Sequence, residues 1–105
     1  MKLIKINTSD NKLITIELKI DSKTKDKFTS DSKLLRSEAV IPLLDKLLKN
    51  NNLTLRDLEA IEVFEGPGSF TGLRVGISIA NALGFLLKIP VNGRMVGELA
   101  SPVYN

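Results

Sequence analysis

The sequence contains neither cysteine nor histidine among its 105 residues. The missing cysteines exclude disulfide bonds and thiol catalysis, and zinc-finger ligand sets cannot form without either residue type. No imidazole is available as a general base, so a hydroxyl nucleophile would need another activating group, such as lysine. A chain without cysteine is also compatible with a reducing compartment, and we expect a cytoplasmic location.

The sequence also has only a small excess of positive charge and no long apolar run. Fifteen Lys and Arg against twelve Asp and Glu give a net charge of +3, which falls short of the strongly basic composition typical of nucleic-acid-binding domains. The longest apolar stretch, residues 75–87, is shorter than the roughly 20 residues that a membrane span requires, and the N-terminus has no signal-peptide core. We therefore expect a soluble protein of one domain.

The hydrophobic pattern predicts an α/β fold. Residues 13–20 alternate strictly between apolar and polar side chains, which is typical of a half-buried strand. Pro42 lies within a later helical pattern, so that helix is expected to begin near Ile41 or to bend there. The expected elements, in chain order, are strands at 3–7 and 13–20, a short edge strand within 21–31, a helix ending near residue 50, a short turn at 54–58, a strand at 60–64, a helix at 73–88 and a strand at 89–92. This β-β-β-α-β-α-β order predicts a mixed sheet with helices packed on it.

A glycine-rich loop joins the strand at 60–64 to the following helix. Its GxGxxxG spacing is one residue longer than a dinucleotide fingerprint, and no lysine follows Gly72 as it would in a phosphate-binding P-loop. Two interpretations remain: the glycines allow tight docking of the helix on the sheet, or the helix N-terminus binds an anion, with Ser69 or Thr71 as helix cap. The candidate loop residues are Gly66, Pro67, Gly68, Ser69, Phe70, Thr71, Gly72 and Arg74.

Small residues recur every four positions in the second helix, at Gly76, Ala80 and Gly84. This spacing places them on one face, where another backbone can approach closely. The approaching element is either the protein's own sheet or a helix of another subunit. For the second possibility, the candidate partner-contact residues on the two helices are Val40, Leu44, Leu47, Gly76, Ala80, Leu83, Gly84 and Leu87.

The segment from Gly66 to Gly76 (GPGSFTGLRVG) closely resembles the signature of the TsaB (YeaZ) family. Similarity extends to residues 4–9, which resemble the opening strand and turn of that family, and to residues 37–48 and 53–61. The resemblance implies an RNase H-like, actin-like (ASKHA) half-domain. Members of the family are usually about twice this long, so residues 1–105 are expected to correspond to the N-terminal TsaB-like domain alone.

Catalysis is not expected from these residues. Two-metal chemistry on an RNase H-like sheet requires several carboxylates, beginning with an aspartate on the first strand, and Asn7 stands at that place. Arg36 stands where the family has histidine. Glu62 and Glu65 are interpreted as a solvated strand residue and a loop residue. We predict no catalytic residue, no metal site and no cofactor.

The resemblance implies a role in a complex. TsaB-type proteins are partner subunits of the bacterial machinery that makes threonylcarbamoyladenosine in tRNA. The chain is therefore expected to be a non-catalytic scaffold that binds a TsaD-type catalytic subunit through its two helices, with a TsaE-type ATPase in the same complex and homodimers when isolated. Direct tRNA contact is left open. The alternatives are a nucleotide- or phosphate-binding module that uses the Gly66–Gly72 loop, and a truncated domain without a role of its own.

Overall fold

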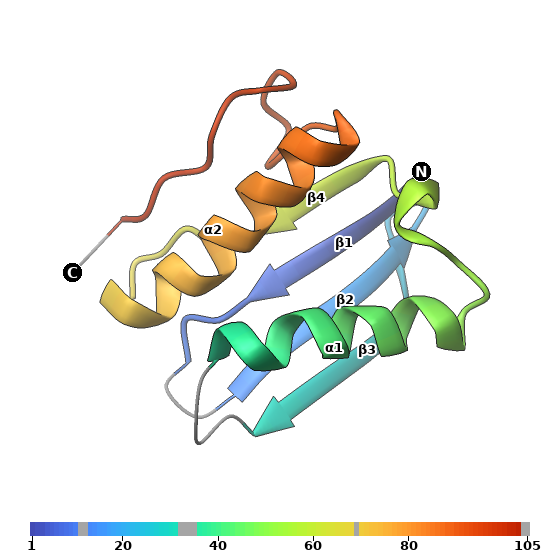
Figure 1. Ribbon diagram of the computed structural model, residues 1–105, viewed down its shortest axis with the longest axis horizontal. Helices are drawn as coiled ribbons and strands as arrows, with labels where there is room; N and C mark the ends of the chain where they lie inside the picture. Colours follow the sequence, from blue (N-terminus) through green and yellow to red (C-terminus); the bar gives the residue numbers. More distant parts are fainter. Residues whose placement is uncertain (11–12, 32–35, 69, 104–105) are drawn as a thin grey trace.

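The sheet of this protein is mixed and has four strands. The computed structural model describes residues 1–10, 13–31, 36–68 and 70–103. Strand order is β3-β2-β1-β4 (Figure 1). Antiparallel pairing joins β1 to β2 and β2 to β3, whereas β4 runs parallel to β1. The strands are β1 (Lys2–Asn7), β2 (Leu13–Ile20), β3 (Lys23–Asp31) and β4 (Ala60–Val63).

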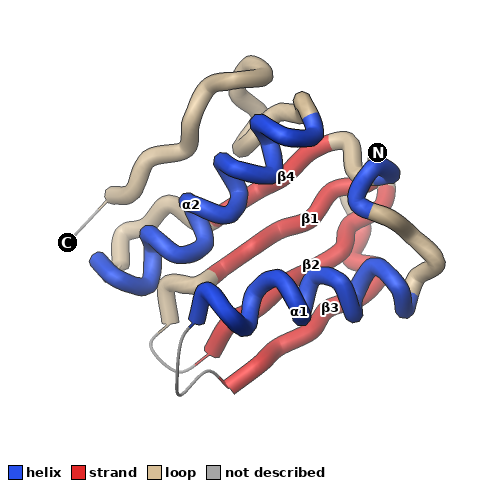
Figure 2. Tube along the Cα trace, viewed as in Figure 1, coloured by secondary structure: helices blue, strands red, loops and turns tan. Residues whose placement is uncertain are grey.

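Two helices lie side by side on one face of this sheet (Figures 1 and 2). They are α1 (Arg36–Asn50) and α2 (Phe70–Leu87), and a short 3₁₀ turn, η1 (Leu55–Asp57), precedes β4. Within the described residues, neither helix is long and apolar enough to cross a membrane. The β-β-β-α-β-α order agrees with the expected fold class.

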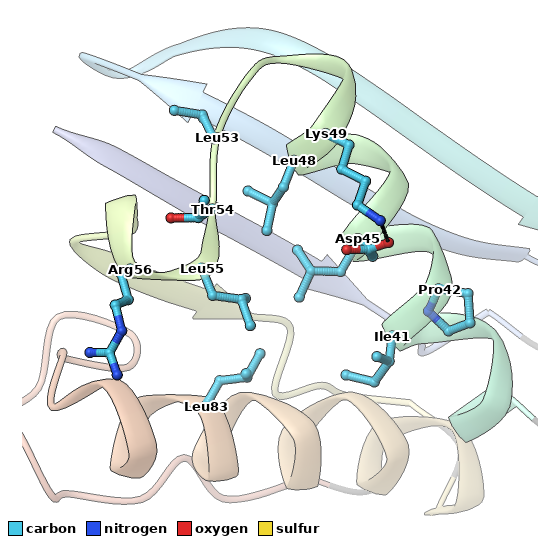
Figure 3. Close-up of a pocket in the computed structure, with 11 residues that line it drawn as sticks. Ile41, Pro42, Asp45, Leu48, Lys49, Leu53, Thr54, Leu55, Arg56 and Leu83 are labelled. Carbon is cyan, nitrogen blue, oxygen red and sulfur yellow. Dashed lines mark ion pairs between the residues drawn. The ribbon is translucent and has the colours of Figure 1, made fainter.

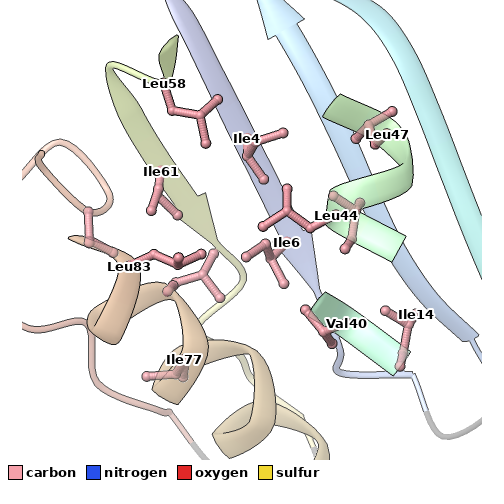
Figure 4. Close-up of a cluster of buried hydrophobic side chains, with 14 of the residues drawn as sticks. Ile4, Ile6, Ile14, Val40, Leu44, Leu47, Leu58, Ile61, Ile77 and Leu83 are labelled. Atoms are coloured by element: carbon pink, nitrogen blue, oxygen red, sulfur yellow. The ribbon is translucent and has the colours of Figure 1, made fainter. Parts of the chain in front are cut away.

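The core lies between the helices and the sheet. Alternate residues of the strands point toward the helices, as strand geometry requires, so Ile4 and Ile6 of β1 are fully buried. Buried side chains of both helices pack against these isoleucines and complete the core (Figure 4). The alternation of residues 13–20 predicts one shared face for Ile14, Ile16, Leu18 and Ile20; the first three are fully buried and Ile20 is half-buried against the core.

The expected final strand at 89–92 is reduced to one bridge between Ile61 and Val91. The Ile61 amide donates to the Pro90 carbonyl at 3.0 Å, and the Asn92 amide donates to the Ile61 carbonyl at 2.8 Å. The backbone then turns, with φ of 54° at Asn92, and the Asn92 side chain pairs with both backbone groups of Val63, at 2.7 and 2.9 Å. A side-chain amide thus replaces the strand that the sequence predicted.

Two further boundaries differ from expectation. The edge strand β3 has nine residues, not a short segment. Helix α1 begins at Arg36 and contains Pro42 in its interior, so the proline does not mark the start of the helix. The helix caps expected at Asp31 or Ser32 lie outside the residues whose side chains the structure describes.

Candidate functional site

The glycine loop is packed against other parts of the same chain. Gly66 has φ of +119°, and a Cβ atom there would lie 2.1 Å from the carbonyl oxygen of Val103. A Cβ atom at Gly68 would lie 3.3 Å from the Cβ of Ser9. Both glycines therefore serve close approach of the loop to neighbouring segments. The described contacts favour tight docking over an anion site.

The remaining loop residues complete this description. Pro67 and Arg74 are exposed, the latter in the first turns of α2. Ser69 and the side chains of Phe70 and Thr71 lie outside the described part of the structure, and so do the capping roles predicted for Ser69 and Thr71.

A buried threonine joins the end of β1 to the start of α2. The Thr8 hydroxyl donates to the Gly72 carbonyl at 2.5 Å and accepts a hydrogen bond from the Gly76 amide at 2.9 Å. A Cβ atom at Gly76 would lie 2.6 Å from this hydroxyl oxygen. At the other end of α2, a Cβ atom at Gly84 would lie 2.5 Å from a methyl carbon of Val91. The small residues of α2 therefore allow parts of the same chain to pack closely against the helix: Thr8, which follows β1, and Val91, which forms the bridge to β4.

The residues of the predicted partner surface lie mostly inside the fold of this chain. Buried side chains have no exposed area to offer a partner, and seven of the eight predicted residues are buried inside the chain's own core, while the eighth is half-buried. The buried residues are Val40, Leu44, Leu47, Gly76, Ala80, Leu83 and Gly84, and the half-buried one is Leu87. Within this set, Leu44 and Leu83 also reach the floor of a groove between the helices.

That groove is open, mainly apolar and about 820 Å³ in volume (Figure 3). It lies between α1, η1 and α2. Ile41 of α1 and Leu55 of η1 remain 48% and 39% exposed at its walls. The other lining residues are Pro42, Leu44, Asp45, Leu48, Lys49, Leu53, Thr54, Arg56 and Leu83. Lys49 pairs with Asp45 at 2.9 Å on the rim, so the wall presents apolar surface flanked by charge.

Helix α2 also carries a second apolar stripe, which the sequence analysis did not single out. Val75, Ile79, Ala82 and Leu86 recur at helical spacing and lie roughly a third of a turn from the glycine face. Val75 and Ile79 are half-buried, whereas Ala82 and Leu86 are exposed. Because α2 is apolar on this stripe as well as on its core face, it has more apolar surface than its own sheet covers.

Glu65, two residues after the end of β4, holds the C-terminal segment in place. Its carboxylate accepts hydrogen bonds from the Arg94 guanidinium at 3.0 Å and the Ser101 amide at 2.8 Å. The second guanidinium nitrogen of Arg94 lies 2.9 Å from the other carboxylate oxygen. Burial alone would raise the pKa of Glu65, but the hydrogen bonds from Arg94, Ser101 and Asn92 outweigh it and hold the pKa below its ordinary value.

This lowered pKa predicts acid sensitivity. The unfolded chain takes up a proton at higher pH than folded Glu65 does, so the contribution of Glu65 to stability is present above its ordinary pKa and is lost as pH falls through the folded value. In thermal melts between pH 7 and pH 3, we expect the Glu65→Gln variant to lose less stability than the wild type. Glu62→Gln on β4, which makes the same change in charge, serves as the matched comparison variant. A parallel slope for Glu65→Gln would contradict the prediction.

The polar groups near the loop are engaged in structural bonds. The Asn7 side-chain oxygen accepts hydrogen bonds from the Ser9 amide at 2.9 Å and the Ser9 hydroxyl at 2.7 Å, an arrangement typical of an Asx turn. Glu65 is paired with Arg94, as described above. In the described part of the chain, no group of three or more acidic side chains could hold a metal ion.

Comparison with known proteins gives three results. The family model "TsaD: tRNA N6-adenosine threonylcarbamoyltransferase" matches residues 32–94. The tRNA threonylcarbamoyladenosine biosynthesis protein TsaB of Bacillus subtilis is 31% identical over 116 aligned residues, which cover 100% of this chain and 50% of that protein. A solved structure, YeaZ from Pseudomonas aeruginosa, has a TM-score of 0.79 and 26% identity, covering 90% of this chain and 43% of that one.

The chain is also similar to proteins named as transferases. The tRNA N6-adenosine threonylcarbamoyltransferase of Nitrosospira multiformis is 44% identical over 66 residues, which cover 61% of this chain and 19% of that protein. Since the family model matches more than half of the chain, the chain belongs to this family, and within it to the TsaB (YeaZ) proteins. The resemblance and the actin-like fold class expected from the sequence are thereby confirmed. The chain spans about half the length of the Bacillus subtilis relative.

Proposed function

We propose that this chain is a non-catalytic subunit of the cytoplasmic machinery that makes threonylcarbamoyladenosine in tRNA, and that it binds a TsaD-type catalytic subunit. The observation that carries the proposal is the open apolar groove between α1, η1 and α2. An apolar groove between two helices is suited to the apolar face of a partner helix. The partner surface is thus assigned to the walls of the groove and not to the buried small residues of α2.

The non-catalytic role is supported by the chemistry of the loop region. Asn7 is neutral and forms a turn with Ser9, and the Glu65 carboxylate is neutralised by Arg94. Neither group is free to act as a base or to hold a metal. A TsaE-type ATPase belongs to the same proposed complex, and in isolation a second copy of the chain would occupy the groove and form a homodimer. The alternative function, a phosphate-binding module, is less favoured, because the described glycines of the loop pack against other segments of the same chain.

The test is the affinity for the TsaD-type protein of the same organism, measured by calorimetry after co-expression has shown a complex. Replacing Leu55 by aspartate places a charge on the wall of the groove, and burying it without a counter-ion is costly. We expect at least a hundredfold loss of affinity, about 2.7 kcal/mol. Ile41→Asp should act in the same way.

Leu13→Asp is the matched control. Leu13 is 41% exposed, similar to Leu55, but it lies at the start of β2, away from the groove. This variant should bind as the wild type does, and all three variants should keep the circular dichroism spectrum of the wild type. Unchanged affinity of both groove variants would contradict the proposed surface.

A further inference from the structure

The positive charge of the protein is concentrated in its first third. Residues 1–35 contain eight lysines and five acidic residues, whereas residues 36–105 contain seven residues of each sign. The entire net charge of +3 therefore belongs to the part of the chain that forms β1, β2 and β3. A charge asymmetry of this kind points to an anionic partner.

The lysines gather where the sheet ends. Strand β3 is the edge strand on the α1 side of the sheet (Figure 1). Its residues Lys23, Lys25 and Lys27 are all exposed, and Lys19 lies beside them on β2, paired with Thr24 in the register. These four residues are called the lysine edge below. The ladder shifts by one residue between Leu18 and Lys19, which leaves Lys25 as the extra residue of β3.

The acidic groups nearest to the lysine edge, among them Glu17 opposite Lys27 in the register, interact with groups other than the lysine ammonium groups. The Asp26 carboxylate accepts hydrogen bonds from the side chains of Asn50 at 3.2 Å and Asn51 at 2.8 Å. Asp21 pairs with the N-terminal ammonium group, and Glu17 accepts a hydrogen bond from the Thr24 hydroxyl.

Asp26 and Glu17 keep their negative charge, because the groups that donate to them are neutral. The lysine ammonium groups are nevertheless available to a ligand, since in the described part of the chain they are not held in ion pairs. Within the described residues, no ammonium group of the lysine edge lies in ion-pair distance of a carboxylate. Lys46 adds a further cation at this edge, because its ammonium group lies 5.7 Å from the centre of the Phe28 ring on β3.

We propose that the lysine edge binds the phosphate backbone of RNA. Lys25, the extra residue at the register shift, lies between Lys23 and Lys27 along the exposed edge, and a closely charged backbone that follows this edge can contact several of these long side chains at once. Lysine acts as a flexible point charge and needs no fixed geometry for phosphate. The choice of RNA over another polyanion rests on the proposed function in tRNA modification. A membrane surface is less favoured because the aromatic side chain of β3, Phe28, is half-buried against the core and cannot insert into lipid.

The lysines also have a structural role that the experiment must separate from binding. Charged side chains on an edge strand prevent it from pairing with other chains. That protection is given by charge of either sign, whereas phosphate binding requires positive charge. Reversal of charge therefore removes the proposed binding and keeps the edge protected.

The test uses the 105-residue chain and a fluorescently labelled, unmodified tRNA transcript, with anisotropy measured over a range of salt concentrations. For Lys23→Glu/Lys25→Glu/Lys27→Glu we expect affinity to fall about tenfold or more, and the slope of log affinity against log salt to decrease by about 2 to 3. The corresponding triple arginine variant should bind as the wild type does. Lys25→Glu and Lys88→Glu form a matched pair with the same change in net charge, and only Lys25→Glu should weaken binding.

Equal affinity of the triple glutamate variant and the wild type would overturn the proposal, and so would tighter binding to vesicles of phosphatidylcholine and phosphatidylserine than to the transcript. Affinity for the TsaD-type protein is measured in parallel and should be unchanged in the triple glutamate variant. If RNA binds through the lysine edge but no complex with the TsaD-type protein forms, the proposed function is refuted and the lysine edge is not. A TsaD-type complex without RNA binding by this chain would refute the lysine edge alone.

Discussion

The Ala80→Leu variant is expected to melt about 4 to 24 °C below the wild type. Ala80 is fully buried on the face of α2 that meets the sheet. The larger side chain has no space there, and overpacking of this kind typically costs about 1 to 3 kcal/mol. In a domain of this size each kcal/mol lowers the melting temperature by about 4 to 8 °C. Thermal melts followed by circular dichroism measure the effect.

Ala82→Leu provides the control on the same helix. It adds the same volume at an exposed position two residues further on, so the melting temperature should change by less than about 2 °C, in line with surface substitutions. Sedimentation of both variants completes the experiment. If Ala80→Leu kept the wild-type melting temperature and abolished association, Ala80 would face another subunit and the packing of α2 described above would be wrong.

The Gly66→Ala variant is expected to destabilise the protein by about 2 to 4 kcal/mol. At φ of +119° a residue with a Cβ atom is strained, and this Cβ atom would also meet the Val103 carbonyl oxygen at 2.1 Å. The C-terminal segment must then move away, which breaks the 2.7 Å hydrogen bond from the Val103 amide to the Glu65 carbonyl. Denaturant unfolding gives the change in free energy, and hydrogen exchange at the Val103 amide reports the release of the segment.

Gly93→Ala separates backbone strain from the clash. Gly93 has φ of +70°, and a Cβ atom there would meet nothing within 4 Å. This variant should cost only the conformational penalty of about 1 kcal/mol and leave exchange at Val103 unchanged. Equal destabilisation of the two variants would show that the glycine loop does not depend on contact with the C-terminal segment.

Short-range patterns identified most of the elements. The alternation of residues 13–20 matches β2 residue for residue, because a strand with one buried face imposes a period of two. Helix α1 ends at Asn50, where the sequence predicted a helix end near residue 50. The strand predicted at residues 89–92 does not form, because the Asn92 side chain takes the backbone hydrogen bonds of Val63. A side chain that replaces backbone hydrogen bonds leaves no periodic pattern in the sequence, so this difference could not be predicted.

The candidate site, too, could be predicted from the sequence only in part. The eleven-residue glycine segment was specific enough to indicate the family, and the comparisons confirm it. The groove had no sequence signal of its own, because Ile41, Leu55 and Leu83 come from three separate elements that only the packed fold brings together. The lysine edge was visible as a lysine-rich segment, but the engagement of neighbouring Asp26 by Asn50 and Asn51 depends on the tertiary contact of α1 with β3.

The sequence by itself determined most of the elements, the α/β class and the family, since these depend on local periodicity and on a contiguous motif. It could not determine which neighbour the small residues of α2 admit. Spacing by four residues defines a face of a helix, and both the protein's own sheet and a foreign helix require small side chains there. In the tertiary structure the neighbours of these small residues belong to the chain's own sheet region, because Thr8 lies against Gly76 and Val91 against Gly84. The partner surface proposed here consequently moves to the groove walls, where apolar side chains remain exposed.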